Sequence, residues 1–206
     1  DQYFVLHGDL AVLRDRGLLD NFVGGERAER KNAKGGDDGF AEYMELRDPP
    51  PEGEEADPAE PYLARYRLPL IDKVIISGLV RGQSVSRPGL IIESVVSTAD
   101  VLGDAADPTI WQAIPRRAKR DADLGPPTPY RGLAAYLQVT QLRFQPGALL
   151  VECHAVLEEP YGWFNGRNLL ASKLATASNE NVRSLRRKLA KAMEEAAAEN
   201  GANREP

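Results

Sequence analysis

The sequence has few of the residue types that form disulfides and metal centres. Among its 206 residues it contains one cysteine, Cys153, and two histidines, His7 and His154. One cysteine cannot form an intrachain disulfide, and together with two histidines it is too little for the usual Cys/His zinc sites. We therefore expect no disulfide framework and no metal site.

Long hydrophobic runs and an excess of positive charge are also missing. No apolar run approaches the roughly 18 to 20 residues of a membrane span, so we expect a soluble chain that does not cross a bilayer. The net charge of −5 gives no general positive field, and we expect no nucleic-acid partner. The chain begins at Asp1 rather than at methionine, which is compatible with a removed targeting peptide or upstream segment. The compartment is therefore not predicted.

Common catalytic motifs are absent as well. The sequence has no G-x-x-x-x-G-K-[ST], no G-x-G-x-x-G after a strand, no G-x-S-x-G and no H-E-x-x-H. His154 has Glu152 and Glu158 on its own strand face, where they could orient an imidazole as a general base. No nucleophile in a recognisable local context accompanies it, and a half-exposed surface histidine is the simpler interpretation. We assign no catalytic residue and expect no cofactor.

The overall composition is that of an ordinary globular protein. Hydrophobic residues make up 42% of the chain and charged residues 28%, and 206 residues suit one domain. Two segments are too polar to enter a core: 26–38, which ends in two glycines and two aspartates, and 49–61, with the sequence PPPEGEEADPAEP. We interpret both as polar loops inside a single domain that covers 1–206.

The centre of the chain is typical of β-structure. Segments 73–80 (KVIISGLV) and 90–96 (LIIESVV) are rich in β-branched residues. They are separated by RGQSVSRPG, where Gly82 and Pro88-Gly89 are turn signals, so we predict an antiparallel pair. Further predicted elements are a strand at 3–6, a helical segment from Leu10 to Phe22, a strand at 110–114, and a hairpin of strands 133–144 and 148–158 around Gln145-Pro146-Gly147.

Two periodic patterns predict how the sheet and a helix are buried. Alternation places the odd-numbered positions of the last strand on one buried face: Leu149, Val151, Cys153, Ala155 and Leu157. Spacings of three and four predict a helix over 178–200, with Ser178 as N-cap and a stop at Asn200-Gly201. Its apolar stripe consists of Val182, Leu185, Leu189, Met193 and Ala196.

These patterns predict the α+β class. We expect an antiparallel sheet of five to seven strands with the C-terminal helix packed across its concave face, because each apolar surface needs the other as cover. A barrel or sandwich with an appended helix is the rival architecture.

The segment between the last strand and this helix, EPYGWFNGRNLL at 159–170, is rich in aromatic residues. Tyr161, Trp163 and Phe164 are costly to leave in water, so they either fill the core or form a site or an interface. We predict that Trp163 is buried against the helix start near Leu169 and Leu170, and that its indole N–H donates to an acceptor.

The pattern from about residue 62 to 195 resembles the second half of START and Bet v 1-like (helix-grip) domains. The resemblance rests on the strands, on PYGWFNGRNLL and on NVRSLRRKL in the helix. It implies a curved antiparallel sheet that grips a long C-terminal helix and encloses a lipid or another apolar ligand. Residues 1–60 are loop-rich and depart from the two strands and two short helices that open such domains, so no ligand-binding residue is transferred by motif.

The resemblance implies non-catalytic binding or transfer of a lipid or other hydrophobic small molecule, in a cavity between the sheet and the C-terminal helix. A mostly apolar pocket suits such a ligand better than acid-base chemistry does. The residues we expect to line it are Trp111, Val151, Cys153, Trp163, Phe164, Leu185 and Leu189.

Two alternatives from other classes remain. The chain could be an interaction or assembly module that docks through the 161–164 bend and the basic part of the helix, with an unknown protein partner. It could also be an enzyme of the same fold that uses His154. Two basic clusters would allow transient contact with a membrane surface, although a solvated helix face is the simpler interpretation of the second. They are Arg116, Arg117, Lys119 and Arg120, and Arg183, Arg186, Arg187, Lys188 and Lys191.

Overall fold

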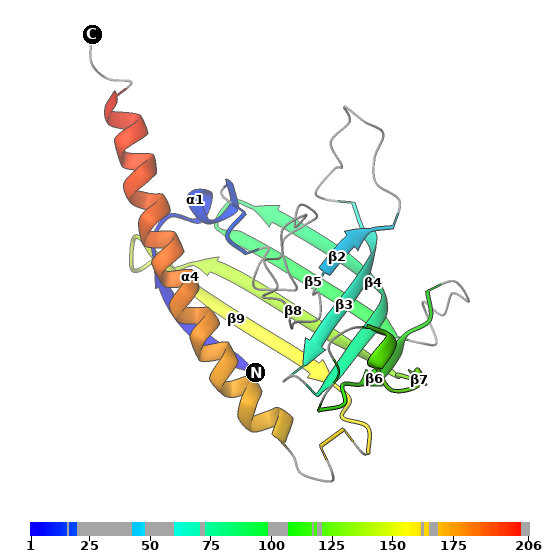
Figure 1. Cartoon of the computed structure of the whole chain (residues 1–206). Helices are drawn as coiled ribbons and strands as arrows, with labels where there is room; N and C mark the ends of the chain where they lie inside the picture. Colours follow the sequence, from blue (N-terminus) through cyan, green and yellow to red (C-terminus); the bar gives the residue numbers. More distant parts are fainter. Residues whose placement is uncertain are drawn as a thin grey trace.

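The part of the chain that the structure describes is an α+β structure in which one antiparallel sheet carries two α-helices on its concave side (Figure 1). The computed structural model describes residues 1–15, 17–19, 43–47, 60–70, 73–98, 107–116, 118, 121–161, 163–164 and 169–202. The predicted polar loop at 26–38 lies outside these residues, as does the loop at 49–61 except for Glu60 and Pro61, which directly precede a strand.

The described part of the sheet has nine strands, more than the five to seven predicted. Seven follow the order β1-β9-β8-β5-β4-β3-β2, and β6 pairs with β4 and with β7. The larger number of strands is due to two short strands, β2 and β7, and to β3 (YLARYRLPL), none of which the sequence patterns predicted. The strands are β1 (Gln2–His7), β2 (Tyr43–Leu46), β3 (Tyr62–Leu70), β4 (Val74–Arg87), β5 (Leu90–Thr98), β6 (Ile110–Ala113), β7 (Thr128–Pro129), β8 (Gly132–Gln141) and β9 (Ala148–Leu157).

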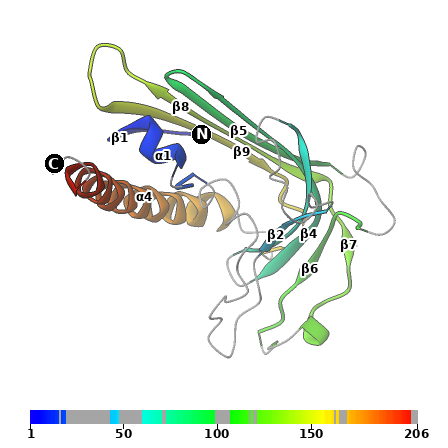
Figure 2. The same cartoon turned by 90° about the horizontal axis from the view of Figure 1, so that it is seen from above.

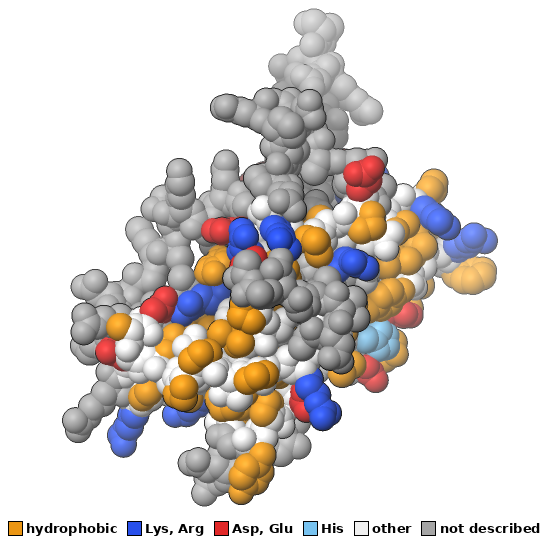
Figure 3. All heavy atoms as spheres, turned by 90° about the vertical axis from the view of Figure 1, so that its right-hand side faces the viewer, with side chains coloured by type: hydrophobic (Ala, Val, Ile, Leu, Met, Phe, Trp, Pro, Cys, Tyr) orange, Lys and Arg blue, Asp and Glu red, His pale blue; other side chains and the backbone are white. Residues whose placement is uncertain are grey.

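The sheet is strongly curved. Seen from above, β1, β9, β8 and β5 form one wall, and β4, β6 and β7 turn toward the side on which α1 (Leu10–Asp15) and α4 (Leu169–Ala202) lie (Figure 2). The predicted antiparallel sheet with a helix on its concave side is therefore confirmed. On the molecular face at the right of Figure 1, hydrophobic, basic and acidic side chains are interspersed (Figure 3).

Strand β4 is longer than its sequence suggests, because Gly82 does not form a turn. It lies inside the strand, where a Cβ atom would come within 2.0 Å of Tyr62 Cζ, so its missing side chain makes room for this ring. The turn to β5 is formed at Pro88-Gly89 instead, with Gly89 at φ 76°, in the left-handed region that favours glycine.

The predicted hairpin of the last two strands is confirmed. Strands β8 and β9 pair in antiparallel register around a turn in which the Ala148 N–H donates to the Gln145 carbonyl (3.0 Å). The predicted burial holds at the start of β9, where Leu149 and Val151 are fully buried. Ala155 is exposed, contrary to the prediction, whereas Leu157 on the same face is half-buried.

The C-terminal helix is longer than predicted at both ends. It begins at Leu169 rather than at Ser178 and continues through Gly201 to Ala202. Ser178 is therefore not an N-cap, and its Oγ donates to Gln2 Oε1 on β1. The earlier start follows from the good helix formers between 169 and 177 and from the buried side chain of Leu170, which anchors the first turn.

Most of the buried hydrophobic side chains that the structure describes belong to two clusters. The helix cluster joins β1, β5, β8 and β9 to α1 and α4, and its members are Leu6, Leu10, Leu13, Leu19, Ile91, Leu137, Val139, Leu149, Val151, Leu185 and Leu189. The aromatic cluster joins β3, β4 and β5 to the segment before β8, the segment after β9 and the first turn of α4. Its members are Ala64, Tyr66, Leu70, Val74, Ile76, Val80, Val95, Tyr130, Trp163, Phe164 and Leu170.

Candidate functional site

The seven residues predicted to bind a ligand do not form one site. Val151, Leu185 and Leu189 belong to the helix cluster. Trp163 and Phe164 belong to the aromatic cluster. Cys153 is half-buried against the first cluster and Trp111 against the second. The predicted lining is therefore divided between two separately packed regions.

The aromatic cluster is centred on Trp163, which is 5% exposed, as its predicted burial requires. Its ring stacks on Tyr130 (centroids 5.6 Å apart, 23° between planes). It meets Trp111 and Phe164 edge-on, with centroids 5.8 and 6.1 Å away. Leu170, in the first turn of α4, packs in the same cluster. Trp163 thus joins the segment before α4 to the β6 side of the sheet.

The predicted hydrogen bond of the indole is wrong. Trp163 Nε1 is buried, and among the described residues it has no acceptor. Unlike the indole, the two nearby phenols have hydrogen-bond partners. The Tyr130 hydroxyl donates to the Glu158 carbonyl (3.0 Å), and the Ser97 hydroxyl donates to the Tyr66 oxygen (3.3 Å). Burial raises the pKa of Tyr66 to about 12, so this phenol keeps its proton at alkaline pH values at which an exposed tyrosine loses it.

A carboxylate separates the two clusters on the concave face. Ile91 and Val95 of β5 point to this face, one into each cluster, and Glu93 lies between them on the same side. The hydroxyl of Ser84 on neighbouring β4 donates to Glu93 Oε1 (2.5 Å). The concave face is therefore not uniformly apolar, and a ligand that covered both clusters would have to pass this polar pair.

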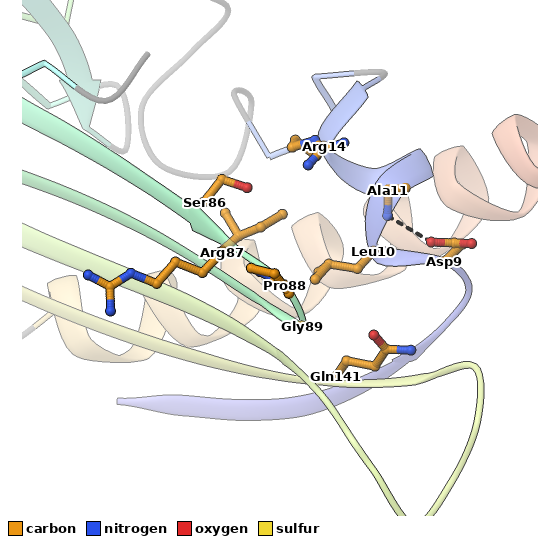
Figure 4. Close-up of a pocket in the computed structure, with 10 residues that line it drawn as sticks. Asp9, Leu10, Ala11, Arg14, Ser86, Arg87, Pro88, Gly89 and Gln141 are labelled. Carbon is orange, nitrogen blue, oxygen red and sulfur yellow. Dashed lines mark hydrogen bonds between the residues drawn. The ribbon is translucent and has the colours of Figure 1, made fainter. Parts of the chain in front are cut away.

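A cavity of about 340 Å³ lies at one end of the concave face, between α1 and the β4–β5 hairpin (Figure 4). Its volume is at the lower end of the roughly 300 to 1,000 Å³ of small-molecule sites. Its apolar floor includes Leu10 and Ile91, both members of the helix cluster. The full lining is Asp9, Leu10, Ala11, Arg14, Ser86, Arg87, Pro88, Gly89, Ile91 and Gln141.

Main-chain hydrogen bonds fix the walls of this cavity. The Gln141 N–H donates to the Gly89 carbonyl (2.9 Å), which joins the end of β8 to the β4–β5 turn. Asp9 caps α1, since its Oδ1 accepts the Ala11 N–H (2.8 Å). Arg14 places a cation at the rim, where its Nε donates to Asp15 Oδ1 (2.7 Å), an interaction that raises the pKa of Arg14.

Sequence reasoning missed this cavity, because none of the seven predicted residues lines it. Two local signals were nevertheless present. Asp9 precedes a helical segment as an N-cap residue does, and Pro88-Gly89 marks a turn. Neither signal shows that α1 and the turn lie side by side, because that proximity depends on the pairing of β1 with β9.

His154 lies on the opposite, convex face of the sheet. Its Nδ1 is 2.9 Å from the carboxylate of Asp1, and the rings of Tyr3 and Tyr136 are 5.5 and 6.0 Å away between centroids. The expected orienting acids are not its partners: the carboxylate of Glu158 faces Arg131 instead (3.7 Å). Cys153, the next residue back, points to the concave side, where burial raises the pKa of its thiol to about 12.

The predicted docking surface is reduced by the burial of the bend. Trp163 and Phe164 are buried, and only Tyr161, 97% exposed, remains on the surface. On α4 the basic residues 183, 187, 188 and 191 are exposed, and Arg186 Nη2 donates to the Val5 carbonyl of β1 (3.1 Å). Of the other basic cluster, only Arg116 lies within the described residues, and it is exposed.

Three further findings bear on the class of protein. In the described ranges, no three His, Cys, Asp or Glu side chains are grouped as metal ligands would be. None of the helices described has a stretch long and apolar enough to cross a bilayer. Comparisons of the chain with models of protein families, with curated proteins and with solved structures find no match.

Proposed function

We propose that the protein binds or transfers a lipid or another hydrophobic small molecule without chemical conversion, and that the ligand lies in the cavity between α1 and the β4–β5 hairpin. The cavity itself carries this proposal, because it combines an apolar floor with a polar rim. The resemblance of residues 62–195 to helix-grip domains supports the same class of ligand. The location differs from the one expected, since α4 contributes Leu185 and Leu189 to the helix cluster but no residue to the lining of the cavity.

The lining favours an amphipathic ligand. Leu10 and Ile91 offer an apolar contact, while the side chains of Ser86 and Gln141 can hydrogen-bond a polar head group. Arg14 adds a positive charge that is shared with Asp15. A carboxylate or phosphate head suits this rim, and an alkyl or ring system suits the floor.

The first experiment blocks the cavity and measures binding of a fluorescent fatty acid. Ser86→Trp places a large ring among the lining residues. Gln83→Trp is the matched control, because Gln83 is an exposed residue of the same strand that faces the convex side. We expect Ser86→Trp to weaken binding of the probe at least tenfold and Gln83→Trp to leave it unchanged. Equal affinity of both variants and the unaltered protein would contradict the proposed site.

The second experiment asks whether a ligand accompanies the protein. Native mass spectrometry of the gently purified protein, followed by organic extraction, should reveal a bound amphipathic molecule that is depleted in Ser86→Trp. A stoichiometric protein partner and no small molecule would instead favour the assembly module.

A further inference from the structure

The β8–β9 turn presents a phenylalanine that nothing in the described structure covers. Phe144 is fully exposed, and the residues that follow it, Gln145, Pro146 and Gly147, are exposed as well. The turn is held by main-chain hydrogen bonds, including the one from the Leu142 N–H to the Ala148 carbonyl (2.9 Å). A large apolar side chain at a defined turn, with no contact to the core, makes no packing contribution to the fold.

This turn lies beside the mouth of the cavity. The Gly147 carbonyl accepts the N–H of Gly8, between β1 and α1, and the Gln141 N–H donates to the carbonyl of Gly89 in the β4–β5 turn. We call residues 86–89 and 141–147, together with the start of α1, the turn end. Figure 2 shows the β4–β5 and β8–β9 turns projecting at the same end of the sheet. Main-chain hydrogen bonds thus connect the turn that carries Phe144 to the segments that line the cavity.

Two exposed arginines belong to the two turns at this end: Arg143 precedes Phe144 in the β8–β9 turn, and Arg87 is the last residue of β4 before the β4–β5 turn. Arg87 and Arg143 are both exposed, and Figure 4 shows the guanidinium of Arg87 directed away from the cavity. Arg14 is the third cation, and it is paired with Asp15. Because the chain as a whole has a net charge of −5, any attraction to an anionic surface must come from such a local group.

We infer that the turn end docks on an anionic lipid surface, with Phe144 inserted among the acyl chains and Arg87 and Arg143 at the phosphates of the head groups. One exposed aromatic ring with two exposed arginines at the same end of the sheet is the chemistry that recognises such a surface. A protein partner would need a contact of about 800 Å² per side with an apolar centre, and the residues next to Phe144 are polar or small. The inference extends the proposed function, because docking in this orientation brings the cavity mouth to the lipids.

Flotation of the protein with vesicles tests the docking directly. We expect binding to vesicles of phosphatidylcholine with phosphatidylserine, weaker binding to phosphatidylcholine alone, and loss at high salt. Phe144→Ala should lower the vesicle-bound fraction about tenfold at unchanged melting temperature. Tyr161→Ala is the matched control, because Tyr161 is equally exposed but follows the far end of β9. It should bind as the unaltered protein does.

Two further variants test the orientation. Arg87→Gln combined with Arg143→Gln should remove the preference for phosphatidylserine. Phe144→Trp should gain fluorescence that brominated acyl chains quench, beyond the signal of Trp111 and Trp163 in the unaltered protein. Absence of vesicle binding, equal loss in the Tyr161 control, or an unquenched Trp at position 144 would each overturn the docking surface.

The outcome is separable from that of the proposed function. Phe144→Ala should bind the fluorescent fatty acid in vesicle-free solution as tightly as the unaltered protein, since Phe144 does not line the cavity. Loss of vesicle binding with retained probe binding supports the inference. Vesicle binding that persists in Phe144→Ala, while Ser86→Trp loses the probe, would refute the docking surface and leave the carrier function standing.

Discussion

The helix cluster and the aromatic cluster are built from different chemistry. Every buried member of the helix cluster is Leu, Ile or Val, so it has no side-chain polar atom to satisfy. The aromatic cluster contains two tyrosines and a tryptophan and has Ser97 beside it. Packing alone can complete the first cluster, whereas the second must also satisfy buried polar atoms, and the indole N–H of Trp163 lacks a described acceptor.

The largest expected effect is the loss of the centre of the aromatic cluster. Trp163→Ala removes the ring that meets Tyr130, Trp111 and Phe164, and it should lower the free energy of unfolding by about 3 to 5 kcal/mol. Trp163→Phe should cost much less, because it keeps most of the ring and removes an unpaired N–H. Urea denaturation measures both. A loss for Trp163→Phe as large as that for Trp163→Ala would contradict this expectation.

Next comes the helix cluster, where truncation of Leu189 should cost about 2 to 4 kcal/mol. Leu189 is 1% exposed and packs so close to the β1–α1 junction that a Cβ on Gly8 would lie 2.8 Å from its Cδ2. If the clusters are independent, the double variant Leu189→Ala/Trp163→Phe should show the sum of the single losses within about 0.5 kcal/mol. A larger coupling would indicate that the clusters stabilise one another.

Alkaline pH should destabilise the protein, in part through the buried phenol of Tyr66 in the aromatic cluster. Below about pH 10 the phenol of Tyr66 is protonated in both the folded and the unfolded chain. Between about pH 10 and 12 the unfolded chain releases this proton while the folded protein keeps it, so the free energy of unfolding falls. Tyr66→Phe should make this fall shallower in denaturation curves recorded across that range. Burial also raises the pKa of Tyr130 and of Cys153, so part of the fall should remain in this variant.

The smallest effect is expected just outside the aromatic cluster. Tyr161 is 97% exposed and only two residues from Trp163, so Tyr161→Ala should change the free energy of unfolding by less than about 0.5 kcal/mol. Calorimetric comparison with Trp163→Ala shows whether the bend stabilises the fold through its buried ring alone. A large loss for Tyr161→Ala would show that the exposed ring also contributes to stability.

Local patterns predicted the parts of the fold that local forces determine. The β8–β9 hairpin follows from Pro146-Gly147 and the alternation after it, and the stripe of Val182, Leu185 and Leu189 is buried as its spacing predicts. The prediction was wrong at Gly82, because a glycine that makes room for the ring of Tyr62 has the same local appearance as one that forms a turn.

The candidate site was less predictable, because it depends on contacts between distant segments. Trp163 was correctly predicted to be buried, but its neighbours Trp111 and Tyr130 come from other segments of the chain, and no local pattern pairs them. The cavity forms where α1 meets the β4–β5 turn, and its residues carry no shared motif. Only the sheet topology brings them together.

The pairing of β1 with β9 has a consequence for how the molecule folds. Leu6 of β1 lies opposite Leu149 of β9, and Arg186 of α4 donates a hydrogen bond to the Val5 carbonyl. Within the described structure, strand β1 therefore pairs only with elements from the last third of the chain. Contacts between such distant segments slow folding. During synthesis β1 and α1 therefore remain without their partners until β9 has left the ribosome, and the cavity beside α1 cannot form before then.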